Sequence, residues 1–142
     1  MASQDTTQTL YGVPHSLYTG IARCYLRTQG IAYTEIPTTD ADFHTRILPI
    51  IQRSIIPVLE TPQGPIFETG AILLWLADIH PSTAPLPDSP ARGAYLKWLF
   101  FVSNTLHPDL RMVFYPHLYV GSDPAAQAAL RATVQGRLRA HL

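Results

Sequence analysis

SIIPVLETPQGPIFETGAILLWL, residues 54–76, contains four structural signals in succession. Its first apolar run contains Pro57, and a second apolar run follows the turn residues Pro62–Gly64. Two short strands joined by a tight turn are antiparallel. The polar pair Glu68–Thr69 then precedes an apolar helix, and free N–H groups and the positive end of a helix dipole meet at such a point. The stretch therefore predicts strand, turn, strand and helix, with a ligand site at the start of the helix.

The residues before this stretch predict a strand, a helix and a second strand. Thr9–Val13 is a short apolar run ended by proline, and residues 14–19 are predicted to be a loop. Gly20–Gln29 has apolar side chains on one face, with Gly30 as its C-terminal cap, and Ile31–Ile36 is strand-like. The β-α-β order indicates a parallel pair of strands.

Prolines and acidic residues divide the remaining chain. Asp40 could cap a short helix that Pro49 would stop. Residues 81–90 contain four prolines and are predicted to be a linker of limited flexibility. Long helical patterns follow, in which Pro108 kinks or ends the first and Asp123 caps the last. The order is βαβ-α-ββα, linker and helices, which is that of an α/β thioredoxin-like domain with a mixed sheet followed by an all-α domain.

Composition excludes several classes of protein. The chain has 142 residues, 46% hydrophobic and 14% charged, with a formal net charge of zero, so no nucleic-acid partner is expected. Its single cysteine, Cys24, allows no disulfide framework and is predicted to be buried in the first helix. The histidines have no metal-ligand spacing, so we expect no metal. The polar first residues and the lack of a membrane-length apolar run predict a cytoplasmic protein with no membrane partner.

The chain resembles the glutathione S-transferases in several motifs that occur in the same order. Ile56–Leu59, IPVL, resembles the VPVL segment of that family, whose proline is cis. Glu68–Ile72, ETGAI, resembles its E-S-x-A-I segment, with threonine where serine is usual. Ser16, Arg23 and Gly30 have the spacing found in serine-type members. The resemblance covers essentially the whole chain.

This resemblance implies two domains and a homodimer. Residues 1–80 would form the thioredoxin-like glutathione-binding domain and residues 81–90 the linker. Residues 91–142 would form a partial all-helical domain, apparently truncated, because the chain is about a third shorter than full-length members.

The resemblance also implies that a hydroxyl group holds the sulfur of glutathione as a thiolate, the nucleophilic form. A hydroxyl donor lowers the pKa of a thiol because it stabilises the anion. Ser16 is the first candidate for this donor, Tyr18 is the second, and Thr19 is the third. The alternatives are an ordinary loop serine at Ser16 and a helix cap at Thr19.

The binding residues implied by the family are in the opening stretch. Ile56, held by Pro57, would pair with the ligand through its backbone, as an added strand does. Glu68 would bind the α-ammonium group of glutathione, and Thr69 with the helix N–H groups would bind the α-carboxylate. The alternative for Glu68–Thr69 is a capped helix and no more, and both roles are compatible.

Two basic side chains could reach the glycine carboxylate of glutathione. They are Arg53 and His44, and for each a solvated side chain is an equal alternative. Aromatic residues of the helical part could line a pocket for an electrophile, but aromatic side chains on helices are more often core, so none is assigned to the site.

Two hypotheses of function follow. In the first, the protein is an enzyme that binds glutathione, activates its thiolate and transfers it to a small electrophile. In the second, it is a non-catalytic binding or interaction module of the same fold. Thiol–disulfide exchange is disfavoured, because no cysteine is present in the loop at residues 14–19.

Overall fold

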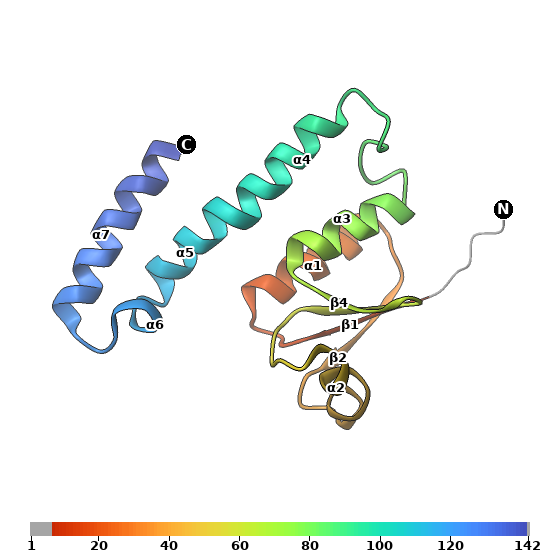
Figure 1. The fold of residues 1–142 in the computed structure, drawn as a ribbon, viewed down its shortest axis with the longest axis horizontal. Helices are drawn as coiled ribbons and strands as arrows, with labels where there is room; N and C mark the ends of the chain where they lie inside the picture. Colours follow the sequence, from red (N-terminus) through yellow and green to blue (C-terminus); the bar gives the residue numbers. More distant parts are fainter. Residues whose placement is uncertain (1–6, 142) are drawn as a thin grey trace. The chain divides into compact units, whose positions relative to one another are not determined.

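The structure is a computed structural model that describes residues 7–141 and divides into two compact units, one ending at Ser89 and one beginning at Pro90. Figure 1 shows their elements. In the first unit, strands and helices follow in the order β-α-β, short helices, β-β-α. In the described part of the second unit, all regular elements are helices.

The sheet of the first unit is mixed. Its strands are β1 (Gln8–Gly12), β2 (Tyr33–Pro37), β3 (Val58–Thr61) and β4 (Gly64–Phe67), arranged in the order β2-β1-β3-β4. β1 is parallel to β2, whereas β3 is antiparallel to both β1 and β4. The predicted thioredoxin-like topology is confirmed.

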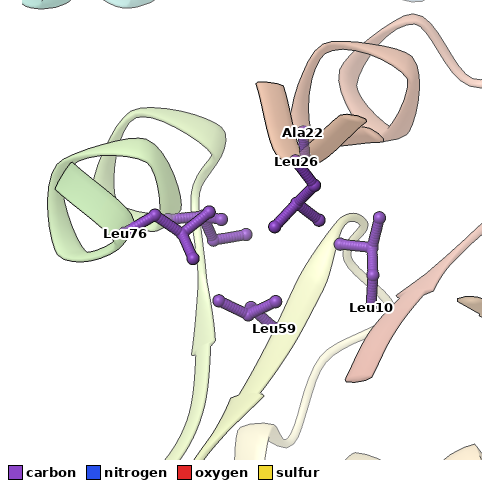
Figure 2. Packing of buried hydrophobic residues seen from close by; sticks show 6 residues of the cluster. Leu10, Ala22, Leu26, Leu59 and Leu76 are labelled. Atoms are coloured by element: carbon purple, nitrogen blue, oxygen red, sulfur yellow. The ribbon is translucent and has the colours of Figure 1, made fainter. Parts of the chain in front are cut away.

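One face of the sheet is covered by α1 (Leu17–Thr28) and α3 (Thr69–Ile79), which lie on the same side in Figure 1. Side chains of both helices meet those of β1 and β3 in a hydrophobic cluster, part of which Figure 2 shows. Its fully buried members are Leu10, Ala22, Leu26, Leu59, Ile72 and Leu76. Each buried leucine stabilises the fold by about 1.5–3 kcal/mol, so this cluster fixes both helices on the sheet.

The opposite face of the sheet is covered by a π-helical turn, η1 (Phe43–Ile47), and by α2 (Leu48–Ile51). Tyr11 and Val58 face this second cluster, although their neighbours Leu10 and Leu59 face the first. Successive side chains of a strand point to opposite faces, so the alternation along β1 and β3 decides both clusters.

The second unit consists of α4 (Arg92–Phe101), η2 (Val102–Leu106), α5 (His107–Phe114), α6 (His117–Val120) and α7 (Pro124–His141). Asp123 accepts a hydrogen bond of 2.9 Å from the N–H of Ala125, so its predicted capping role is confirmed. Two hydrogen bonds from the Arg137 guanidinium to the buried carboxylate of Asp109 join α7 to α5.

The two prolines predicted to interrupt helices both lie in the first turn of the next helix. The prediction that Pro49 stops a helix was therefore wrong, and of the two effects predicted for Pro108, a kink or an end, the end is excluded. A proline ring collides with the carbonyl four residues earlier. In both cases that carbonyl belongs to a π-helical turn, whose wider coil accommodates the ring.

The start of the first helix also differs from the prediction. α1 begins at Leu17 and not at Gly20, because Ser16 caps it, so residues 17–19 are helical and not loop. Its end agrees with the prediction: Gly30 has φ 66°, and its N–H donates to the carbonyl of Arg27. Cys24 is exposed, so the prediction that it is buried was wrong.

Part of the proline-rich segment is held against α1 within the first unit. The Tyr25 hydroxyl of α1 donates a 2.9 Å hydrogen bond to the Thr83 hydroxyl, which in turn donates to the carbonyl of His80. This segment is therefore anchored at Thr83. Among the described residues, no helix is both long and apolar enough to cross a membrane.

Candidate glutathione site

One end of the sheet brings three chain segments together. The register sets Tyr11 of β1 opposite Val58 of β3, and Val58 opposite Phe67 of β4. The segments that extend β1 and β4 and the one that leads into β3 therefore meet at that end. They are the loop at residues 13–16, the pair Ile56–Pro57 and the pair Glu68–Thr69.

Ser16 is held by three hydrogen bonds at the start of α1. Its N–H donates to the carbonyl of Val13 at 3.0 Å, and its own carbonyl accepts from the N–H of Gly20 at 2.9 Å. Its hydroxyl oxygen accepts from the N–H of Thr19 at 3.3 Å. A serine hydroxyl has one proton to donate and two lone pairs, so capping uses only acceptor capacity. Within residues 7–141 no group accepts that proton, which leaves it for a ligand.

The other two hydroxyl candidates differ in accessibility. Thr19 is fully buried, and its hydroxyl oxygen accepts a 3.4 Å hydrogen bond from the N–H of Val13. It has no surface with which to contact a ligand. Tyr18 is half-buried in the first turn of α1 and stays the alternative donor.

The Ile56–Pro57 peptide bond is cis, and Pro57 is fully buried. In the described part of the chain, neither the N–H nor the carbonyl of Ile56 has a hydrogen-bond partner. Buried backbone groups are nearly always paired, and Ile56 is only half-buried. Its two backbone groups can therefore pair with an extended peptide, as an edge strand does.

Glu68 has a strained backbone at the start of α3. Its φ is 72° and its ψ 116°, in a region that costs a non-glycine residue about 1–3 kcal/mol. Its carbonyl accepts from the N–H of Ile72 at 3.0 Å, while its side chain is exposed and makes no capping hydrogen bond. Thr69 is buried beside it. Within residues 7–141 the Glu68 carboxylate has no hydrogen-bond partner, and it stands at the N-terminus of an 11-residue helix.

The two basic candidates lie in different surroundings. Arg53 is exposed, with its guanidinium carbon 5.5 Å from the centre of the Phe67 ring, one residue before Glu68. His44 is exposed on η1, edge-on to Phe43 at 5.7 Å between ring centres. The structure thus brings Arg53 to the end of the sheet where Phe67 lies, and it gives no such link for His44.

The sequence did not reveal the polar cluster beside this site. The Tyr11 hydroxyl, under the sheet, donates to Asp42 at 2.6 Å and to Glu60 at 3.3 Å, and Arg46 pairs with both carboxylates. Burial and the two carboxylates raise the pKa of Tyr11 well above its usual range, while the Tyr11 hydroxyl lowers the pKa of Asp42. The hydroxyl of a buried tyrosine usually has a hydrogen-bond partner. Tyr11 in a buried strand was therefore the signal in the sequence that could have predicted a polar cluster.

Within residues 7–141, no three or more His, Cys, Asp or Glu side chains are grouped so as to hold a metal ion.

Residues 10–85 match the family model described as the N-terminal domain of glutathione S-transferase. The chain belongs to the glutathione S-transferase family. Solved structures of this family have the same fold over nearly the whole chain. A Sulfitobacter glutathione transferase homologue with bound glutathione is 19% identical with a TM-score of 0.68, covering 94% of this chain and 66% of its own. A Phanerochaete chrysosporium glutathione transferase with oxidized glutathione is 17% identical with a TM-score of 0.71, covering 96% and 68%.

The curated proteins that match this member of the glutathione S-transferase family are named elongation factor 1-gamma. Elongation factor 1-gamma 2 of Oryza sativa subsp. japonica is 35% identical over 99 residues, and the match covers 61% of this chain and 22% of that protein. Probable elongation factor 1-gamma 2 of Arabidopsis thaliana is 33% identical over 92 residues, with the same coverage. The chain thus spans about a fifth of the length of these relatives.

Proposed function

We propose that this chain binds glutathione and stabilises its thiolate for transfer to a small electrophile. The observation that carries the proposal is that two features meet at one end of the sheet. Within residues 7–141 the Ser16 hydroxyl proton has no acceptor, and α3 starts at the strained Glu68 without a side-chain cap. Strain of this kind persists where surrounding structure enforces it, and it is common at ligand sites.

Each part of glutathione has a proposed partner. The exposed Glu68 carboxylate would bind the α-ammonium group, and the Thr69 hydroxyl with the N–H groups of α3 would bind the α-carboxylate. The free backbone groups of Ile56, held by Pro57, would pair with the cysteinyl part of the ligand. Arg53 would reach the glycine carboxylate from above Phe67. The Ser16 hydroxyl would donate to the sulfur, with Tyr18 as the alternative donor.

The test measures binding and thiol ionisation separately. Glutathione affinity is measured by calorimetry, and thiolate formation in the complex by ultraviolet difference absorbance over a pH series. We expect binding, and a pKa of the bound thiol below the value of about 8.5 for a free thiol. Ser16→Ala should keep affinity within about threefold and return the pKa to that value, since one hydroxyl donor is lost. Ser82→Ala, an exposed serine away from the site, is the matched control.

Two results would overturn the proposal in different ways. Absence of glutathione binding removes the whole of it. Binding with an unchanged thiol pKa in Ser16→Ala removes the donor role of Ser16, and the same titration of Tyr18→Phe then tests the alternative.

A second candidate function is a non-catalytic binding or interaction module. The observation in its favour is that the curated relatives at 32–35% identity are named elongation factor 1-gamma and not transferases. Retention on immobilised glutathione, without turnover of a chlorinated aromatic electrophile at any pH tested, would favour this second function. Turnover that depends on Ser16 would exclude it.

The proposal includes a cytoplasmic homodimer, as the family resemblance and the low cysteine content suggest. Sedimentation velocity over a range of concentrations tests the dimer, because a single species with the mass of one chain contradicts it.

A further inference from the structure

The most constrained contact near the proposed site lies behind Ser16. Thr19 is fully buried one turn into α1, where its side chain packs against Gly12 at the end of β1. A Cβ atom on Gly12 would collide with Cγ2 of Thr19 and lie 2.7 Å from its hydroxyl oxygen. Gly12 is therefore required for close approach, because only a glycine leaves room for this threonine.

Thr19 is hydrogen-bonded to Val13 and to Ser16, the two ends of the loop at residues 13–16. Its hydroxyl oxygen accepts from the N–H of Val13 at 3.4 Å, and its own N–H donates to the hydroxyl of Ser16 at 3.3 Å. Ser16 in turn donates its N–H to the carbonyl of Val13 at 3.0 Å. Val13, Ser16 and Thr19 thus form a closed ring of hydrogen bonds, with the buried side chain of Thr19 as its fixed point.

We infer that Thr19 is a positioning residue for Ser16: locked against Gly12, it holds the Val13–Ser16 loop so that the Ser16 hydroxyl presents its proton to the ligand sulfur. This rests on the proposed function. A threonine side chain is stiff at χ1, and that of Thr19 is fully buried and packs closely against Gly12. The sequence suggested Thr19 as a hydroxyl donor to the sulfur of glutathione. We infer instead that Thr19 acts on the sulfur only indirectly, by positioning Ser16.

The experiment separates positioning from general stability. Thr19→Val keeps the shape of the side chain and removes the oxygen that accepts from Val13. We expect it to raise the pKa of bound glutathione, with a threefold to tenfold loss of thiolate at neutral pH, about the effect of one hydrogen bond. Affinity for S-methylglutathione, whose sulfur cannot ionise, should stay within about twofold. Thr19→Ser restores the acceptor and should recover most of the thiolate.

A second variant keeps the test valid if Thr19→Val does not fold. Thr19→Ala removes the same acceptor but leaves room for water at the Val13 N–H, and we expect the same rise in thiol pKa. Thr28→Val, at the exposed end of the same helix, should change neither the pKa nor either affinity.

Each outcome decides the inference. A raised thiol pKa with unchanged affinity for S-methylglutathione supports it. An unchanged pKa in both Thr19→Val and Thr19→Ala overturns it, as does a parallel loss of both affinities, which a merely structural residue would give. If Ser16→Ala raises the pKa but the Thr19 variants do not, only this inference fails. If wild-type protein does not bind glutathione, the proposed function fails, and if Ser16→Ala has no effect, the donor role of Ser16 fails. The inference falls in either case.

Discussion

The hydroxyl of Tyr11 on β1 donates a 2.6 Å hydrogen bond to the carboxylate of Asp42, 31 residues later in the chain. Tyr11 is fully buried, and the centre of its ring lies 5.8 Å from the centre of the Phe43 ring. This contact fixes the start of η1 to the underside of the sheet, close to the end at which the candidate site lies.

Tyr11→Phe should therefore destabilise the first unit without changing its shape. The hydroxyl is lost while the ring stays in place, and the expected cost is about 1 kcal/mol. Urea unfolding followed by circular dichroism measures it. Tyr33→Phe, which removes an exposed hydroxyl bonded to Arg27, is the control and should change stability by less than about 0.5 kcal/mol. Equal midpoints for the two variants would contradict the role given to Tyr11.

The ion pair of Glu35 predicts how the stability of the protein depends on pH. Its carboxylate receives two hydrogen bonds, of 2.6 and 2.7 Å, from the guanidinium of Arg23 on α1, and these lower the pKa of Glu35 in the folded state. A carboxyl group with a depressed folded pKa stabilises the protein above its unfolded pKa of about 4.3. That stabilisation is lost as the pH falls through the folded value.

Glu35→Gln should consequently be less stable than wild type at neutral pH, by about 1 kcal/mol. The difference should shrink below about pH 4 and vanish when Glu35 is protonated in both states. Thermal midpoints measured from pH 7 to pH 3 check this. A difference that stays constant over the whole series would show that the ion pair does not contribute through charge.

The ion pair of Asp109 and Arg137 is predicted to stabilise the second unit. Asp109 is 4% exposed, so removal of Arg137 leaves a buried carboxylate without its guanidinium partner, although His141 Nε2 lies 3.8 Å from Oδ2. Arg137→Met should destabilise this unit by about 2 kcal/mol, and addition of Asp109→Asn should recover part of the loss. Arg139→Met, an exposed change on the same helix, is the control. If the double variant is as unstable as the sum of the two single ones, the pairing is not the source of the effect.

Glu68 links strain to binding. Glu68→Gly removes the penalty of a positive φ, so we expect the midpoint of thermal unfolding to rise while affinity for glutathione falls at least tenfold. Glu68→Gln keeps the strained backbone and should lose affinity without gaining stability. Calorimetry and thermal unfolding of both variants measure this. A Gly variant that binds as well as wild type would remove Glu68 from the site.

Much of the first unit follows from local sequence. The alternation of Leu10 with Tyr11 and of Val58 with Leu59 determines which side chains each face of the sheet receives, because strand side chains point to opposite faces in turn. Glycine at position 30 and aspartate at position 123 determine a helix end and a helix start through contacts within a few residues.

The candidate site follows from sequence only in part. The motifs around Ile56 and Glu68 suggested the binding residues by resemblance. The start of α1 was misread, because the choice between Ser16 and Thr19 as cap depends on where Thr19 packs. Cys24 was misread because one face of a helix is buried only if something covers it.

The sequence by itself thus determined the order of elements, the mixed sheet and the family, since these depend on periodicity and on motifs of neighbouring residues. Tertiary structure alone decided the contacts of Thr19 and Tyr11. Thr19 is fixed by the space that Gly12 leaves, and Tyr11 by the carboxylates of Asp42 and Glu60. Such contacts join residues distant in the chain, and their energies depend on distances that no local pattern specifies.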